Sequence, residues 1–130
     1  MQTATLIDSD GIEIFYRSWL PAAPTAIVLV LHGASEHSGR YDAFARALNG
    51  AGYAVYADDH RGFGHSASQT GIGKSGPRGF DGVLDSIYAV QDLVQRLPKS
   101  ELFTEKASAA DDHSPQTGRR ITSSRAGPLA

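Results

Sequence analysis

The feature that most constrains the fold is the unbroken aliphatic run at residues 26–31 (AIVLVL), which leads directly into His32 and Gly33. A strand with one face in water alternates apolar and polar residues, whereas a parallel strand covered on both faces is apolar throughout. The run is also far shorter than the roughly 20 residues of a membrane-spanning helix. It therefore predicts a buried strand in a parallel α/β sheet.

The segments around this strand predict the remaining elements. Residues 3–8 (TATLID) and 12–21 (IEIFYRSWLP) are strand-like runs around the turn residues SDG, which predicts a hairpin. One apolar face predicts a helix over roughly 39–49, residues 53–57 (YAVYA) predict a strand, and a second apolar stripe after a Gly-rich loop predicts another helix. The helical faces are Tyr41, Phe44, Ala45 and Leu48, and Phe80, Val83, Leu84, Ile87, Val94 and Leu97. Such alternation specifies an α/β sheet with helices on its faces.

Composition excludes several classes of protein. The 130 residues allow one small domain, and 12 Lys and Arg against 14 Asp and Glu give no basic surface for nucleic acid. The absence of cysteine excludes disulfides and thiolate metal sites. The N-terminus lacks the basic start and apolar run of a signal peptide, so we expect a cytoplasmic protein without a transmembrane segment.

The composition changes sharply near Pro98. Residues 1–98 contain the periodic apolar segments, whereas residues 99–130 are rich in Ser, Ala, Thr and charge, with few large apolar side chains. A segment of that kind cannot recover its ordering entropy by burial. We therefore expect one partial domain at 1–98 and a low-complexity tail at 99–130 that is disordered or foreign to the fold, such as the product of a frameshift.

Two loops carry the candidate chemistry. In parallel α/β sheets ligands bind at loops that leave the carboxyl ends of the strands, here HGASEHSGRY (32–41) and DDHRGFGHSAS (58–68). Four of the five histidines lie in these loops. The small residues Gly33 and Ala34 let the backbone approach a bound group with an N–H exposed, as an oxyanion hole requires.

These two motifs, in this order and separated by a helix and a strand, resemble the start of the monoacylglycerol lipase and lysophospholipase group of α/β-hydrolases, which is serine aminopeptidase S33-like. The resemblance covers about residues 10–97. It implies an α/β-hydrolase fold truncated before the nucleophile elbow, no cofactor, and hydrolysis of lipid-like carboxylic esters by a Ser-His-Asp triad and an oxyanion hole. The Ala34 N–H would be an oxyanion donor, and Gly33 and Phe63 would contact substrate. The remaining motif residues would be structural: His32, Glu36, His37, Asp59, His60, Arg61, Gly62, Gly64 and Ser66.

The segment GHSAS at 64–68 is one residue short of the Gly-x-Ser-x-Gly nucleophile motif. A nucleophile elbow is a sharp turn between a strand and a helix, but Ser66 lies well beyond YAVYA, in a long loop. GKSGP at 73–77 is a weaker match, and no such motif follows Leu97. We therefore expect no nucleophile, acid or catalytic histidine among these residues, His113 included, and no activity from the chain alone.

Other interpretations are weaker. GIGKSG resembles a phosphate-binding loop, but Ser68 stands where the Walker pattern requires glycine. The pairs His32/His37 and His60/His65, with Glu36, Asp58 and Asp59, could suggest a metal site, yet a spacing of five in loops favours hydrogen bonding over metal ligation. Arg40 and Arg61 could bind an anionic substrate, although structural ion pairs are more common; Lys74 and Arg78 are expected to be solvated.

The alternative hypothesis for the function of this chain is a non-catalytic role. In the family that the chain resembles, the AIVLVL strand pairs with the nucleophile strand as well as with YAVYA. Without that neighbour one aliphatic edge would be bare, and a bare, uncharged edge is a template for another chain. This alternative predicts self-association or dependence on a partner.

Overall fold

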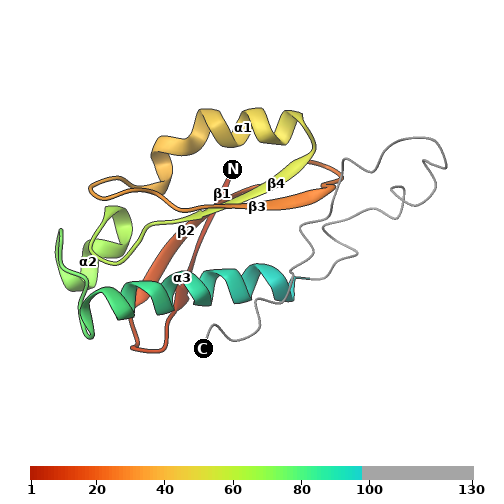
Figure 1. Ribbon diagram of the computed structural model, residues 1–130. Helices are drawn as coiled ribbons and strands as arrows, with labels where there is room; N and C mark the ends of the chain where they lie inside the picture. Colours follow the sequence, from red (N-terminus) through yellow and green to blue (C-terminus); the bar gives the residue numbers. More distant parts are fainter. Residues whose placement is uncertain (98–130) are drawn as a thin grey trace.

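A mixed sheet of four strands, in the order β1-β2-β4-β3, organises the computed structural model, which describes residues 1–97 (Figure 1). The strands are β1 (Gln2–Ile7), β2 (Glu13–Trp19), β3 (Ala26–Val30) and β4 (Tyr53–Asp58). β1 and β2 form an antiparallel hairpin, β2 pairs antiparallel with β4, and β3 pairs parallel with β4. The predicted order of hairpin, strand, helix, strand and helix is confirmed. The predictions for residues 99–130 lie outside the described residues.

The two longer helices cover opposite faces of the sheet (Figure 1). Helix α1 (Asp42–Gly50) follows the short helix η1 (Ser38–Tyr41), and helix α3 (Gly79–Arg96) follows a loop that contains η2 (Gly64–Ser66) and α2 (Ala67–Thr70). The Gly-rich loop thus has a helical turn that the sequence did not predict. No helix within residues 1–97 is long and apolar enough to cross a bilayer.

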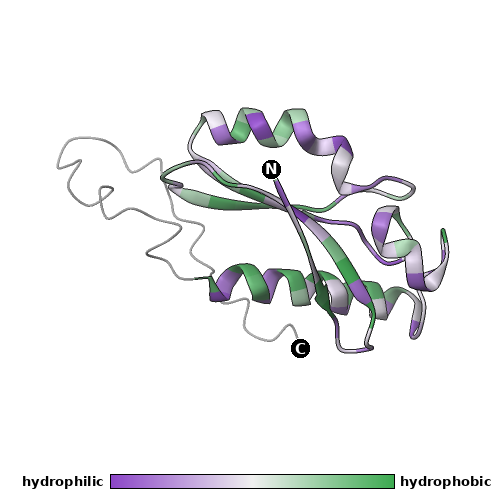
Figure 2. Ribbon diagram, turned by 180° about the vertical axis from the view of Figure 1, so that it is seen from behind, coloured by the Kyte–Doolittle hydropathy of each residue, from purple (hydrophilic) through white to green (hydrophobic). Residues whose placement is uncertain are grey.

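Burial on both faces explains the continuous apolar runs. On one face, β3 contributes Val28 and Val30 to a cluster with Trp19, Ala45 and residues of β4. On the other, Ile27 and Leu29 pack with Val94 of α3 and its neighbours. Figure 2 shows the hydrophobic colouring of β3 between the two helical layers. Because successive side chains point to opposite faces, every position of such a strand must be apolar.

The predicted helical faces require correction at two aromatic residues. Phe80 is 72% exposed and Phe44 is 53% exposed, so neither belongs to the core. The buried residues of α3 are Gly82, Ser86, Val90 and Val94, four apart along the helix. The N-terminal half of this face is small and polar because a charged side chain lies against it.

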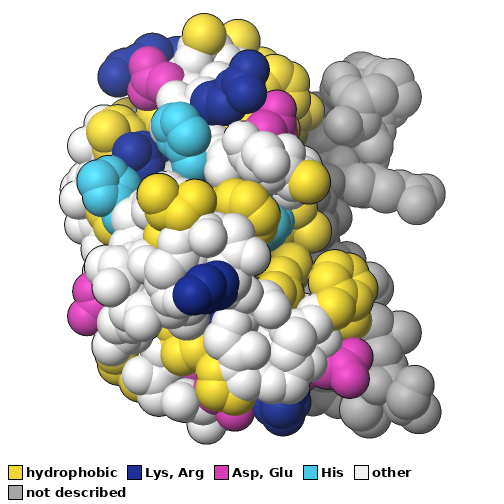
Figure 3. Space-filling model, turned by 90° about the vertical axis from the view of Figure 1, so that its left-hand side faces the viewer, with side chains coloured by type: hydrophobic (Ala, Val, Ile, Leu, Met, Phe, Trp, Pro, Cys, Tyr) yellow, Lys and Arg dark blue, Asp and Glu magenta, His cyan; other side chains and the backbone are white. Residues whose placement is uncertain are grey.

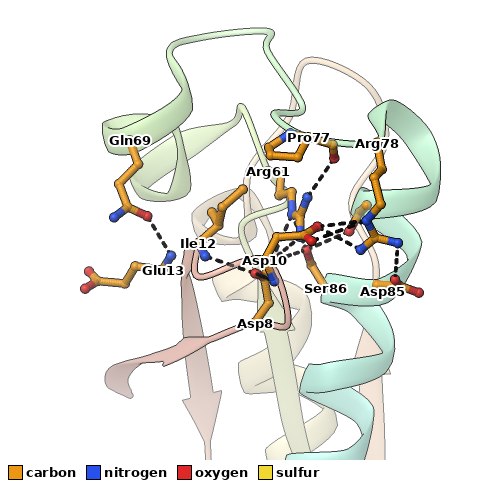
Figure 4. Close-up of polar contacts among 11 residues, drawn as sticks. Asp8, Asp10, Ile12, Glu13, Arg61, Gln69, Pro77, Arg78, Asp85 and Ser86 are labelled. Atoms are coloured by element: carbon orange, nitrogen blue, oxygen red, sulfur yellow. Dashed lines mark hydrogen bonds and ion pairs between the residues drawn. The ribbon is translucent and has the colours of Figure 1, made fainter.

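That side chain is Arg61, which is fully buried and joins three parts of the chain (Figure 4). Its Nη2 lies 2.6 Å from Asp8 Oδ2 and 2.8 Å from Asp10 Oδ2, both in the hairpin turn. Its Nε lies 2.6 Å from the Ser86 hydroxyl of α3, and its Nη1 donates to the Pro77 carbonyl. We call these five residues the Arg61 cluster; it fastens the hairpin turn, the loop after β4 and α3 together.

Small residues and local turns complete the Arg61 cluster. A Cβ at Gly82 would overlap both the Arg61 guanidinium and the Pro77 carbonyl oxygen, so glycine permits the close approach of α3. The other Asp8 oxygen, Oδ1, accepts the backbone N–H groups of Asp10 and Ile12. Burial acts to raise the pKa of Asp8, but these N–H groups, Ser86 and Arg61 outweigh it and lower the pKa.

Arg78 also differs from expectation. Predicted to be solvated, it instead pairs with Asp10 at 2.7 Å and with Asp85 at 2.7 Å, while remaining 45% exposed. Pairs so open to solvent contribute little to stability, because water and salt screen them.

We expect Arg61→Leu to lower the free energy of unfolding by about 3–5 kcal/mol, because the buried Asp8 carboxylate loses its counter-charge. Arg78→Leu is the matched control, since it removes a cation from the same Asp10 at an exposed position, and it should change stability little. Urea denaturation of both variants measures the difference. Equal losses in the two variants would contradict this account of the Arg61 cluster.

Candidate active-site loops

The parallel pairing of β3 and β4 places the two predicted loops at one edge of the sheet. Val30 is opposite Ala57 in the register, so the chain leaves both strands at the same level, toward His32 and His60. Figure 3 views this end of the molecule, where histidine side chains lie among hydrophobic ones. The loops predicted to carry the site therefore meet in space.

The first loop turns sharply at residues 33–36. The Glu36 N–H donates to the Gly33 carbonyl at 3.3 Å, and Ser35 has a φ of 62°. A positive φ at the third residue of a four-residue turn is the type II pattern, a position that favours glycine. The Glu36 carboxylate accepts the Gly33 N–H at 2.9 Å and the Tyr41 hydroxyl at 2.8 Å. These donors lower the pKa of Glu36, the Gly33 N–H most strongly.

This turn separates the two small residues that the sequence grouped together. The Gly33 N–H is already bonded to Glu36, whereas Ala34 is exposed and its N–H has no acceptor among residues 1–97. Of these two residues, only Ala34 therefore has an N–H that no group within residues 1–97 accepts. The sequence could not distinguish the two, because the difference depends on where the Glu36 side chain points.

His32 and His60 join the two loops. Their rings stack with centroids 3.8 Å apart and planes 28° apart. The His60 backbone N–H donates to His32 Nε2 at 2.9 Å, and the His60 ring lies between the Asp58 carboxylate at 2.8 Å and the His32 carbonyl at 3.1 Å. The spacing of five residues within each loop gives no hint of this pair, since each ring comes from a different loop.

Asp59 fixes the outer parts of both loops. Its buried carboxylate accepts the Ser38 N–H at 2.7 Å, the Ser38 hydroxyl at 2.5 Å and the His65 N–H at 2.9 Å. Burial acts to raise the pKa of Asp59, but these three donors outweigh it and lower the pKa. Gly64 packs so closely that a Cβ there would overlap the carboxylate.

Ser66 lies in a setting unlike that of a nucleophile. It is 1% exposed, and its hydroxyl oxygen accepts the Phe15 N–H of β2 at 2.9 Å. Neighbouring His65 packs its ring on Phe15 with centroids 4.5 Å apart, instead of facing the Ser66 hydroxyl. The segment GHSAS therefore closes the loop against the edge of the hairpin.

The other predicted residues lie as follows. Phe63 is half-buried, with its ring edge toward His32 at 5.8 Å between centroids. His37 is exposed and its Nδ1 accepts the Gly39 N–H, while Gly62 lies against the Lys74 backbone. Arg40 is 3.7 Å from Glu36 at the surface, and Arg61 belongs to the buried cluster described above. Within residues 1–97, no three His, Asp or Glu side chains are placed to hold a metal ion.

We expect Asp59→Asn to lower the free energy of unfolding by about 1–3 kcal/mol, because the amide nitrogen cannot accept the hydrogen bonds that the carboxylate oxygen accepts. Asp92→Asn, at an exposed position of α3, is the matched control and should leave stability unchanged. Thermal and urea denaturation measure both. A loss at Asp92 as large as that at Asp59 would attribute the effect to net charge alone.

Residues 22–105 match the family model described as serine aminopeptidase, S33. Monoglyceride lipase of Homo sapiens is 46% identical over 65 residues, 49% of this chain and 22% of the relative. The Rattus norvegicus monoglyceride lipase is 43% identical over 93 residues, 71% of this chain and 27% of the relative. The chain thus spans about a quarter of the length of these relatives.

Solved structures agree with the sequence matches. A thermostable carboxyl esterase from Bacillus coagulans superposes with a TM-score of 0.66 at 31% identity, covering 72% of this chain and 31% of that one. A lipase in its open form gives a TM-score of 0.60 at 35% identity, covering 74% of this chain and 31% of that one. With more than half of its residues matched by the family model, the chain belongs to the serine aminopeptidase S33 family of α/β-hydrolases.

Proposed function

We propose that the chain carries the oxyanion side of a serine hydrolase site that cleaves carboxylic esters of lipid-like substrates. The observation that carries this proposal is the Ala34 N–H, which belongs to an exposed residue and has no acceptor among residues 1–97, in a turn closed by the Glu36 N–H and the Glu36 carboxylate. A preorganised backbone donor stabilises the negative charge that develops on the ester oxygen in the transition state. No cofactor enters this chemistry.

The nucleophile of such a site lies outside these 130 residues. No Gly-x-Ser-x-Gly segment occurs among them, and Ser66 is buried with its hydroxyl bonded to Phe15. An oxyanion hole also takes a second N–H from the residue that follows the nucleophile. The chain alone is therefore inactive, and it contributes its half of the site when the rest of an α/β-hydrolase is supplied.

The substrate class follows from the relatives. Those named above are monoglyceride lipases, which supports monoacylglycerols, with lysophospholipids as the related class. In this proposal Phe63 contacts the apolar part of such an ester together with Gly33, and the edge-on packing of the Phe63 ring beside His32 supports that role. We place this activity in the cytoplasm.

A test combines the isolated chain with a chimera. The 130 residues should release no product from a monoacylglycerol and should not react with a fluorophosphonate probe. Substituting residues 22–97 for the matching segment of the Rattus norvegicus monoglyceride lipase should retain hydrolysis. In that chimera Ala34→Pro should lower kcat about 100- to 1,000-fold, the typical effect of losing one oxyanion donor.

The turn supplies a matched control for the chimera. Proline is favoured at the second position of a type II turn, so Ala34→Pro removes the N–H without opposing the local backbone. Ser35→Gly keeps the Ala34 N–H and relieves the positive φ, so its kcat should equal that of the unmodified chimera. A chimera that tolerates Ala34→Pro, or an isolated chain whose turnover disappears in Ser66→Ala, would refute the proposal.

The second candidate is a partner-dependent or self-associating role, favoured by the position of β3. β3 ends the sheet, and among residues 1–97 it pairs only with β4. Its sequence is wholly aliphatic, and Leu31 beyond it is 49% exposed. An edge without charge or proline pairs readily with the same edge of a second copy.

We expect the isolated chain to elute as dimers or larger species in size exclusion with light scattering, and Leu31→Lys to shift it toward monomer. A charge beside the edge opposes pairing of two copies. Leu20→Lys is the matched control, since Leu20 is similarly exposed at 44% but follows β2. A monomeric parent chain, or equal effects of the two lysines, would exclude association through β3.

A further inference from the structure

The hydrogen-bond partners of the His32 and His60 rings indicate which ring nitrogens carry hydrogen. Both ring nitrogens of His60 face atoms that only accept: Asp58 Oδ2 at 2.8 Å and the His32 carbonyl at 3.1 Å. A ring with two acceptors satisfies both only when both nitrogens carry hydrogen. Asp58 is completely buried, and among the described residues its second oxygen, Oδ1, has no hydrogen-bond partner.

The His32 ring has the opposite requirement. Its Nε2 accepts the His60 backbone N–H, so that nitrogen has no hydrogen, and its Nδ1 faces the Gly33 carbonyl at 2.7 Å and therefore carries one. His32 is thus a neutral imidazole stacked 3.8 Å from a charged one. A second proton, on Nε2, would break the bond from His60 and place two like charges face to face.

We propose that this stacked pair is a proton-dependent lock, which fastens the loop carrying Gly33 and Ala34 to the loop after β4 only while His60 is charged and His32 is neutral. Both histidines are positioning residues, because they fix the backbone on either side of the free N–H without reaching an external ligand. The lock itself stands on hydrogen-bond geometry and does not require that the chain hydrolyse esters.

The groups around the pair determine the direction in which the pKa of each histidine shifts. Asp58 and Asp59 face it from the end of β4, Glu36 from the turn, and the Phe63 ring covers one edge of His32. Burial is the main cause that lowers the pKa of His32. Burial acts in the same direction on His60, but the hydrogen bond and charge of Asp58 outweigh it and raise that pKa.

The two pKa shifts affect stability on opposite sides of the ordinary histidine pKa. His32, with its pKa lowered from about 6.5, stabilises the fold fully above that value, and the contribution is lost as pH falls through the lowered pKa. His60, with its pKa raised, contributes fully below about 6.5, and the contribution is lost as pH rises through the raised pKa. The link between the loops is therefore strongest between the two pKa values.

The wild-type chain provides the first measurement. Deuterium exchange at the ring C2 hydrogens, read by mass spectrometry as a function of pH, reports each histidine's titration separately. His60 should titrate above the ordinary histidine value of about 6.5, and His32 should titrate below it. The reverse order, or coincidence of the two, would overturn the assignment of protons on which the lock rests.

The second measurement uses His32→Gln, whose side-chain oxygen can accept the His60 N–H but cannot take up a proton. Exchange of the His60 amide, corrected for the intrinsic pH dependence, should speed up about tenfold in the parent chain as His32 becomes protonated, the effect of losing one such bond. In His32→Gln this acceleration should be absent. His65→Gln, the same change at an exposed histidine, should keep it.

Two results would contradict the lock. One is an acid acceleration in His32→Gln equal to that of the parent chain; the other is an acceleration that disappears in His65→Gln. Because the ring titration uses the unmodified chain, a failure of either variant to fold leaves that test intact. Neither the ring exchange nor the amide exchange depends on esterase activity in the chimera. The experiments can therefore refute this inference and the proposed function independently of each other.

Discussion

The parallel pairing of β3 with β4 is the constraint on which the rest of the site depends. Five register pairs, from Ala26 opposite Tyr53 to Val30 opposite Ala57, align the ends of the two strands. The loops that follow are 28 residues apart in sequence at His32 and His60, yet their rings stack. Without the shared edge of the sheet, no local interaction in either loop would bring these groups together.

Charged side chains, rather than apolar packing, hold the loops in place. Arg61, Asp58 and Asp59 are each fully buried. Arg61 connects the segment after β4 to the hairpin turn and α3, and Asp59 connects it to the start of η1. Asp58, the last residue of β4, holds the His60 ring within its own loop. Hydrogen bonds to charged groups are stronger and more directional than neutral ones. They can therefore fix glycine-rich loops that have few apolar side chains to pack.

This arrangement leaves the Ala34 N–H unused. Glu36 takes the Gly33 N–H, the histidine pair holds the residues before the turn, and Asp59 holds those after it. Ala34 projects from the middle with its N–H free among the described residues. A rigid backbone with an open donor is what oxyanion stabilisation needs, because the donor pays no reorganisation cost when charge develops. The proposed role in ester hydrolysis thus follows from the surroundings of Ala34 as much as from Ala34 itself.

The sequence alone determined the fold class and which loops meet at one edge of the sheet. Continuous apolar strands, a Gly turn and alternating helices are local patterns that specify this architecture, and the motifs at 32–41 and 58–68 follow the two parallel strands. Tertiary structure decided which polar groups form hydrogen bonds and ion pairs with one another. Phe80 shares the period of α3 but is exposed, because Arg61 of the loop after β4 lies against the start of that helix, where the buried residues are Gly82 and Ser86. Phe44 shares the period of α1 and is also exposed. Tertiary contacts also decide that the Gly33 N–H is bonded while the Ala34 N–H is not, and that His32 meets His60. Periodicity indicates which face a residue is on, whereas a hydrogen bond depends on the distance between atoms that can be far apart in the chain.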